Sequence, residues 1–422
     1  MQNNAWKSKA EALDRYRWLL LRERHGWFGS LLRFARDAIR DWCFGVCARC
    51  RQERSLEVTS CDFLLLQSAP KMIALGRKKR LIETLRDRGH TLIETALQTP
   101  GVILRQRRLI APPFPVPTRY FGFAAHAEWL ASRYRPKILL NDRNGSPYSP
   151  FLRLALNARL SLLVQLAHAT TLETSRRLGM NDYDDYLLFG ASSEAALRKR
   201  SLIFGTSTLI LSGSHLIDET FDMPAATPAM KTVLVLGVGP DKEKEASYQK
   251  SYRVTSEWAM SHPESFVLVK PHPRSKVVLW REMAKDHSNV EILPSGTSLA
   301  DALARSSIVI NFISNAILEA SLAKRPIIYV NAGGHVDIFD QARAFGDAIE
   351  TPEALASRIL EIEQDYSTHV AASEKFAHFH LSGGFHGLQR TVAVLESLMN
   401  RTELPHDVES MALAEILPME TP

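Results

Sequence analysis

No stretch of this 422-residue sequence reaches the roughly 18 to 20 uninterrupted apolar residues that a membrane-spanning helix requires, and its N-terminus lacks the apolar segment of a signal peptide. Both absences lead us to expect a cytoplasmic protein. Cysteine is scarce, with four residues, which excludes a secreted disulfide scaffold. The remaining composition, 45% hydrophobic and 23% charged, is that of an ordinary globular protein. At this length we expect two domains of about 150 to 200 residues each.

Two cofactor motifs are also missing. The nearest approach to the dinucleotide pattern Gly-x-Gly-x-x-Gly is Gly237-Val238-Gly239-Pro240, but position 242 is Lys, so a nicotinamide site is disfavoured. Gly237 and Gly239 instead predict a turn whose backbone a ligand can approach closely. No Asp-x-Asp pair flanks the polar turns described below, so we expect no obligatory metal or other cofactor.

The formal charge of +6 is concentrated in the first 50 residues, which hold ten Lys or Arg against five Asp or Glu. Large side chains such as Trp18, Trp27, Phe28 and Trp42 lie among these charges. The mixture fits a helix pair on an anionic membrane, which would place the protein on the inner face of the plasma membrane. It fits equally well helices that pack on the protein and show a solvated basic face. Nucleic acid is not an expected partner, because no reader motif accompanies the charge.

All four cysteines fall within nineteen residues, as Cys43, Cys47, Cys50 and Cys61. The spacing of the first three resembles the iron-sulfur triad of radical S-adenosylmethionine enzymes, and four thiolates could also hold zinc. However, no strand precedes the triad, and the spacing places the three cysteines along one helix face. We therefore predict that they pack as small apolar core residues, with a metal or cluster as the minor alternative.

Short apolar strands alternate with helical segments in both halves of the chain, a pattern that predicts parallel, doubly wound sheets. Predicted strands and apolar stretches lie at 63–66, 91–93, 137–140, 160–165, 185–190 and 208–213, and then at 232–236, 266–269, 290–293, 308–311 and 327–330. The proline-containing segment 218–230 is predicted to be a linker. We divide the chain into a basic amphipathic helical extension at 1–58, an N-terminal Rossmann-like acceptor domain at 59–222, a C-terminal Rossmann-like nucleotide-donor domain at 231–385, and a C-terminal helix and tail at 386–422.

The stretch Lys270-Pro271-His272-Pro273-Arg274 directly follows the predicted strand at 266–269. Its two prolines cannot donate backbone hydrogen bonds, so the strand must end there. In open α/β sheets, ligands bind in the crevice at the carboxyl ends of the strands. Lys270, His272 and Arg274 converging at such an end suit a phosphate or diphosphate.

A second polar turn, with Ser314 and Asn315, follows the strand at 308–311. Both residues are predicted to cap the next helix, whose free N–H groups would add another phosphate-binding surface. Glu319, one turn into that helix, could accept hydrogen bonds from ribose hydroxyls. With the lysine-containing turn expected one strand away, the sequence predicts a nucleotide-phosphate site.

Together, these motifs resemble the C-terminal domain of GT-B glycosyltransferases, whose two Rossmann-like domains face each other across a cleft. The likeness includes an Asp-Ala-Leu helix at 299–304 and Lys324-Arg325-Pro326-Ile327-Ile328, and it covers about 137–335. The chain is most similar to the bacterial capsule and surface-polysaccharide group, which includes Kdo and sialic acid transferases and teichoic acid glycerophosphotransferases. In that group the His-Pro element and the Ser-rich turn hold the donor phosphate. The resemblance therefore implies that role for Lys270, His272, Ser314 and Asn315, and a donor-ribose contact for Glu319.

The resemblance implies a glycosyltransferase that moves a sugar from a nucleotide-activated donor to a surface polysaccharide or lipid-linked acceptor, with a CMP-sugar favoured and a UDP-sugar as the other donor. Asp142 is the first candidate for the catalytic base and His168 the second. The relatives' Gln-His-Gly is replaced here by 165–169, Gln-Leu-Ala-His-Ala, so the base is less well defined than the donor site. Two alternatives stay open: a CDP-glycerol-dependent glycerophosphotransferase, and a non-catalytic GT-B adaptor for assembly or membrane attachment.

Overall fold

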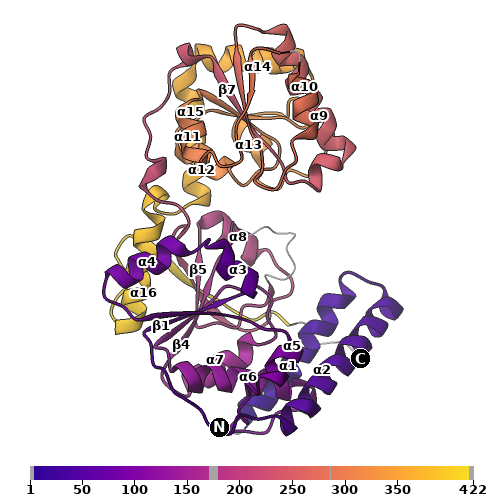
Figure 1. Cartoon of the computed structure of the whole chain (residues 1–422), viewed down its shortest axis with the longest axis vertical. Helices are drawn as coiled ribbons and strands as arrows, with labels where there is room; N and C mark the ends of the chain where they lie inside the picture. Colours follow the sequence, from indigo (N-terminus) through magenta and orange to yellow (C-terminus); the bar gives the residue numbers. More distant parts are fainter. Residues whose placement is uncertain (1–3, 171–178, 286, 418–422) are drawn as a thin grey trace. The chain divides into compact units, whose positions relative to one another are not determined.

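The computed structural model describes residues 4–170, 179–285 and 287–417. They form two compact units, each built around its own parallel sheet (Figure 1). Unit 1 combines Met1–Leu216 with Leu388–Pro422, and unit 2 is Ile217–Gly387. Among these residues, no helix is both long enough and apolar enough to cross a membrane.

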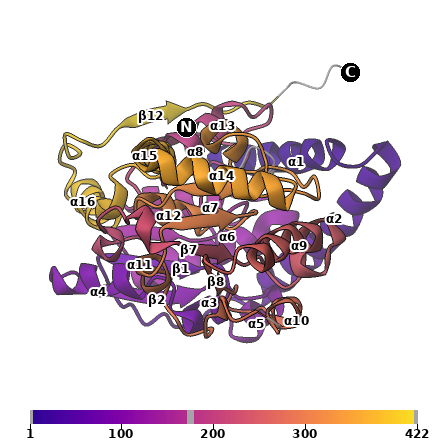
Figure 2. The ribbon, with the colours of Figure 1, turned by 90° about the horizontal axis from the view of Figure 1, so that it is seen from above.

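The sheet of unit 1 has seven strands in the order β12-β6-β5-β4-β3-β1-β2. All neighbours run parallel except β12, which pairs antiparallel with β6 at one edge (Figure 2). The strands are β1 (Phe63–Gln67), β2 (Leu92–Ala96), β3 (Ile138–Asn141), β4 (Leu162–Leu166), β5 (Asp185–Leu188), β6 (Ser207–Leu211) and β12 (Ser410–Leu413). Continuous burial of β1, β3 and β5 reflects helices on both faces.

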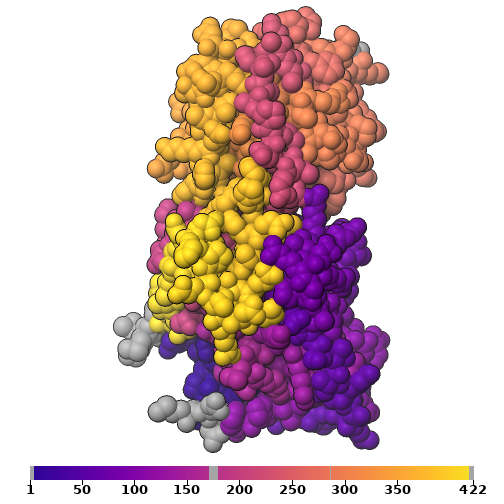
Figure 3. Space-filling model, turned by 90° about the vertical axis from the view of Figure 1, so that its left-hand side faces the viewer, coloured from indigo at the N-terminus to yellow at the C-terminus, as the bar shows by residue number. Residues whose placement is uncertain are grey.

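One face of this sheet packs against α4 and α16 through a core that includes Leu81, Leu85, Val392 and Leu395. These two helices lie side by side, where Arg88 bonds to Glu396 (Figure 3). The chain thus returns from unit 2 to complete unit 1. The helices of this unit are α1 (Ala5–Arg22), α2 (Trp27–Cys50), α3 (Pro70–Leu75), α4 (Lys79–Asp87), α5 (Pro100–Arg105), α6 (Thr118–Tyr134), α7 (Ser149–Asn157), α8 (Ala191–Arg198) and α16 (Gly387–Asn400).

The two N-terminal helices pack on α6 and α7. At the crossing of α2 and α6, a Cβ on Gly45 would lie 1.7 Å from the carbonyl oxygen of Thr118, and a Cβ on Gly122 would lie 2.5 Å from the ring of Phe44. Only glycine fits at either position. The inner face of α2 is therefore fixed against α6, and its opposite face is turned away from unit 1.

The prediction that the cysteines pack in the core is wrong for three of them. Cys43, Cys47 and Cys50 are exposed, because α2 buries the face that carries Phe44 and Ala48 instead. Cys61 is buried, and burial raises the pKa of its thiol to about 11. Among the described residues, no group of three or more His, Cys, Asp or Glu side chains is arranged to hold a metal ion.

Unit 2 contains a five-stranded, all-parallel sheet in the order β11-β10-β7-β8-β9. The strands are β7 (Thr232–Leu236), β8 (Phe266–Lys270), β9 (Val290–Ile292), β10 (Ile308–Asn311) and β11 (Ile327–Tyr329), which confirms all five predicted strands to within a residue. The helices are α9 (Ala246–Ser261), α10 (Val278–Ala284), α11 (Leu299–Ala304), α12 (Ile317–Leu322), α13 (Gln341–Phe345), α14 (Pro352–Gln364) and α15 (Tyr366–His380). Aromatic residues such as Tyr252, Trp258 and Phe312 fill the core between the helices and the sheet.

Candidate functional site

The predicted lysine-containing turn lies at the carboxyl end of β8, which pairs with β7 on one side and β9 on the other, while β10 lies beyond β7. Strand β8 itself includes Lys270, and the turn that follows is closed by a hydrogen bond of 2.8 Å from the backbone N–H of Ser275 to the carbonyl of His272. Lys270 and His272 line a cavity of about 370 Å³ that Ser314 also borders. The structure therefore brings together three of the side chains that the sequence assigned to a phosphate site.

Gly237 sets the distance between β7 and this turn. Its backbone N–H donates to the carbonyl of Lys270 at 2.9 Å. A Cβ at this position would lie 3.1 Å from three backbone atoms, in Lys270, Pro271 and His272. Because a side chain here would be tighter than ordinary contact, the glycine allows the turn to lie directly against the end of β7.

Lys270 carries a half-buried positive charge without a compensating anion. Burial lowers the pKa of its ammonium group, and no acidic side chain counteracts the shift. Within the described residues, its Nζ has no hydrogen-bond or ion-pair partner. A cation that is partly withdrawn from water and unpaired favours the binding of an anion from solution.

His272 is held in a defined orientation. The backbone N–H of Arg274 donates to its Nδ1 at 3.1 Å, so the neutral ring carries its proton on Nε2. Burial, followed by the charge of Arg274, lowers the pKa of the imidazole, although Glu243 opposes the shift. The ring is therefore neutral at pH 7 and acts as a hydrogen-bond donor through Nε2.

The Ser314 turn is built by side-chain hydrogen bonds from its neighbours. Asn311 accepts the backbone N–H of Ser314 at 3.0 Å, and the Ser314 hydroxyl accepts the N–H of Ala316 at 3.3 Å. The helix that follows, α12, begins only at Ile317 and has six residues. A helix this short adds little dipole, so the turn contributes through Ser314 itself.

The other predicted donor residues lie around the cavity and do not line it. Arg274 and Asn315 are exposed, Glu319 is half-buried in α12, and Gly239 has open space around its α-carbon. Sequence reasoning missed Ser295 and Thr297, which also line the cavity and belong to the loop after β9. The signal was present as a Pro-Ser-Gly-Thr turn at 294–297, at the end of a predicted strand.

In unit 1, the two candidate bases form one hydrogen-bonded group with Lys78. Asp142 is fully buried, and its Oδ1 accepts both the Nζ of Lys78 and, at 2.8 Å, the Nδ1 of His168. Burial alone would raise the pKa of Asp142, but the hydrogen bond from His168 and the charge of Lys78 outweigh it and lower the pKa. His168 is about one-third exposed, so the sequence-predicted pair has one accessible member.

Two more polar side chains surround this group. His215 is buried, its Nε2 has no hydrogen-bond partner among the described residues, and burial, followed by the charge of Lys78, lowers its pKa to about 3. Asn141 donates to Gln165, which ties the ends of β3 and β4 together. The sequence did not single out Lys78 or His215, because neither belongs to a recognisable motif. Lys78 lies just before α4, and His215 follows β6.

No protein-family model matches the sequence, and no curated protein does. Solved structures do match. A Listeria monocytogenes protein assigned as a UDP-N-acetylglucosamine 2-epimerase is 12% identical, with 82% of this chain and 98% of that chain covered and a TM-score of 0.55. The S. aureus MnaA–UDP complex is 10% identical, with 82% and 99% covered and a TM-score of 0.53. The kitacinnamycin glycosyltransferase is 14% identical, with 80% and 99% covered and a TM-score of 0.50.

This is the GT-B fold. Two units that each hold a parallel sheet between helices, and matches over almost the full length of the solved chains, confirm the predicted fold class. At these identities the likeness concerns the fold alone. The finer resemblance to Kdo and sialic acid transferases stays a prediction. The GT-B fold nevertheless explains why both polar groups lie at the carboxyl ends of parallel strands.

Proposed function

We propose that this protein is a glycosyltransferase that transfers a sugar from a nucleotide-activated donor, with the donor phosphate in the cavity beside Lys270. The single observation that carries the proposal is the half-buried, unpaired ammonium of Lys270 in a cavity shared with His272 and Ser314. The sequence resemblance favours a CMP-sugar as donor. The solved UDP complex of S. aureus MnaA makes a UDP-sugar the other donor to test.

The chemistry follows from the groups in the cavity. Cleavage of the donor leaves negative charge on a phosphate oxygen, and that charge must be stabilised as the bond breaks. Lys270 supplies a positive charge, and the Nε2–H of neutral His272 supplies a hydrogen bond. Ser314 offers a hydroxyl from the turn after β10, the next strand but one in the sheet. We assign Arg274 and Asn315 to the outer phosphate contacts and Glu319 to the donor ribose. At Gly237 and Gly239, the donor can approach the backbone closely.

The proton of the acceptor hydroxyl passes to His168 in this proposal. Asp142 is fully buried and already accepts two hydrogen bonds on Oδ1, so it cannot reach a substrate. It instead holds His168 through Nδ1, which leaves Nε2 to accept a proton. Asp142 and Lys78 are thus positioning residues. The acceptor, a surface polysaccharide or a lipid-linked glycan, rests on the sequence resemblance.

A thermal-shift panel tests the donor site. We expect CMP or CDP, or else UMP or UDP, to raise the melting temperature at millimolar concentration, because a ligand that binds only the folded state stabilises it. The Lys270→Met variant should lose at least about 90% of the affinity, since charged hydrogen bonds to phosphate contribute roughly 1.5 to 3 kcal/mol. Lys276→Met, which removes an exposed lysine of the same loop, is the matched control and should bind normally.

Transfer assays with radiolabelled donors separate the remaining alternatives. Turnover of CDP-glycerol and of no sugar nucleotide would replace the proposal by glycerophosphate transfer at the same site. Failure of every nucleotide to shift the melting temperature of the wild type would support the non-catalytic adaptor. In the active enzyme, His168→Ala should lower kcat by about 10² or more with little change in KM for the donor.

A further inference from the structure

The outer face of α2 is an uncovered apolar surface. We define it by seven large side chains, each at least one-third exposed: Trp27, Phe28, Leu31, Leu32, Ile39, Trp42 and Val46. Phe28 is 76% exposed and Leu32 is 72% exposed. Single apolar residues are often this exposed, but a whole apolar helix face rarely is. The close contacts of α2 with α6 involve Phe44 and Gly45, which are not among the seven.

The seven residues form one stripe along the helix. At 100° per residue, their positions span less than half of the helix circumference, and the buried Ser30, Phe44 and Ala48 lie outside that span. The stripe runs from Trp27 to Val46, which is about 30 Å at 1.5 Å per residue. Its N-terminal end carries the pair Trp27 and Phe28, whose ring centroids are 5.2 Å apart and which both point into solvent.

Positive charge lies beside the stripe on Arg36 and Arg40, whose positions at 100° per residue fall about 40° and about 80° beyond its edge, whereas Arg33 lies farther round the helix. The exposed charged residues of α2 are Arg33, Arg36, Arg40 and Arg49, and none of its exposed residues is acidic. Both acids of the helix pair with arginines. Asp41 pairs with Arg17 at 2.6 Å, and Asp37 pairs with Arg36 at 3.1 Å. The surface is therefore both apolar and cationic.

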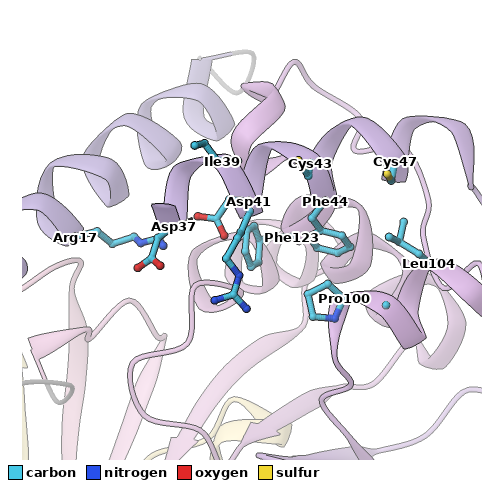
Figure 4. A pocket seen from close by; sticks show the side chains of 12 residues that line it. Arg17, Asp37, Ile39, Asp41, Cys43, Phe44, Cys47, Pro100, Leu104 and Phe123 are labelled. Carbon is cyan, nitrogen blue, oxygen red and sulfur yellow. Dashed lines mark hydrogen bonds and ion pairs between the residues drawn. The ribbon is translucent and has the colours of Figure 1, made fainter. Parts of the chain in front are cut away.

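Apolar surface continues from α2 onto α5. A cavity of about 620 Å³ lies between the two helices, with Cys43 and Cys47 on one side and Pro100 and Leu104 on the other (Figure 4). Two arginines and two aspartates also line it: Arg17, Arg40, Asp37 and Asp41. The exposed cysteines thus lie at the margin of the same apolar region.

We propose that the outer face of α2 binds the surface of an anionic lipid bilayer, with the helix parallel to the membrane plane. Aromatic and leucine side chains enter the boundary between headgroups and acyl chains, and the arginines contact lipid phosphates. A second copy of this chain fits less well, because pairing two such faces would bring their arginines together. Nothing in this inference depends on the proposed transferase activity.

Co-sedimentation with lipid vesicles tests the proposal. At 0.1 M salt, the full-length protein should bind phosphatidylcholine vesicles with 30% phosphatidylglycerol at least about ten times more strongly than pure phosphatidylcholine vesicles. Replacing Trp27, Phe28 and Leu32 together by serine should lower binding at least about tenfold on both. Replacing Arg36 and Arg40 by glutamine should lower it by a similar factor on anionic vesicles only, with a weaker salt dependence.

A matched control removes apolar side chains of similar exposure elsewhere. The triple serine variant of Val336, Leu360 and Phe379, all in unit 2, should bind as the wild type does. Circular dichroism and melting temperature confirm that each variant is folded. Equal loss in the control triple, or no binding of the wild type to anionic vesicles, would overturn the proposal. So would a wild-type dimer that the Trp27, Phe28 and Leu32 variant converts to a monomer, because the face would then be a subunit interface.

Discussion

At the scale of single residues, the cavity beside Lys270 holds a lysine whose charge the fold leaves uncompensated. Lys270 has no acidic neighbour to offset its burial, whereas Lys78 in unit 1 is paired directly with Asp142. The contrast separates two roles for buried lysines. Lys78, paired with Asp142, can orient that carboxylate, whereas the unpaired Lys270 favours the binding of an anion from solution. The residue types at 270 and 272 could be predicted from the sequence, but only the structure shows which of them lacks a partner.

Gly237→Ala should weaken both nucleotide binding and the fold. The new Cβ would lie 3.1 Å from three backbone atoms and must push the turn of Lys270 and His272 away from β7. We expect an affinity loss of at least about tenfold for a loss of stability of roughly 1 to 3 kcal/mol. Calorimetric titration and urea unfolding measure the two effects. Gly101→Ala, whose Cβ would meet no atom within 4 Å, is the control and should lower neither the affinity nor the stability.

His215 makes the stability of unit 1 depend on pH. Its pKa is about 3 in the fold, because of burial and then the charge of Lys78, and about 6.5 in an unfolded chain. Below pH 6.5 the unfolded state therefore binds a proton that the folded state does not. The free energy of unfolding should fall by up to about 1.4 kcal/mol per pH unit as the pH drops from 6.5 towards 3, and His215 should have no effect above pH 6.5.

The comparison of His215→Gln with the wild type measures this contribution. Urea unfolding at pH 7, 6, 5 and 4.5 should give a flatter pH dependence for the variant, with the difference confined to pH values below about 6.5. Parallel curves for the two proteins would mean that His215 titrates normally in the fold.

At the scale of helices and strands, the pattern of buried residues determined which elements could be predicted from the sequence. The strands of unit 2 are short, apolar and flanked by turns, and all five were predicted. Helix α6 was missed because Tyr120 to Ala131 are buried without interruption, which removes the periodicity that marks a surface helix. The edge strand β12 was missed because it pairs with β6 across about 200 residues of chain. For the cysteines of α2, the sequence correctly predicted that they share one helix face. It wrongly predicted that this face is buried.

The crossing of α2 and α6 gives a prediction at this scale. Gly45→Ala should destabilise unit 1 by roughly 1 to 3 kcal/mol, because its Cβ would overlap the carbonyl oxygen of Thr118 and the helices must separate. In Gly29→Ala, in the same helix, the new Cβ would make ordinary contacts with His25 at 3.4 Å and Arg33 at 3.7 Å, so this variant should gain up to about 1 kcal/mol of helix propensity. Urea unfolding of both variants checks the contrast, and equal effects would contradict the close packing of α2 on α6.

At the scale of the whole molecule, the GT-B fold gives each unit one polar group at the carboxyl ends of its strands. The group in unit 2 is cationic and suits a donor phosphate, and the group in unit 1 holds His168 against a buried carboxylate. The sequence predicted both locations, because motif residues follow apolar strands. It did not predict that Lys78 pairs with Asp142 or that Ser295 and Thr297 line the cavity, because these contacts join segments that are distant in the sequence.

The most direct test of this account is a crystal structure with the nucleotide that the thermal-shift panel selects. The account predicts a phosphate oxygen at about 2.7 to 3.2 Å from both Lys270 Nζ and His272 Nε2, with the Ser314 turn on the same phosphate group. A phosphate bound elsewhere, with the cavity beside Lys270 filled by water or by the base, would contradict it.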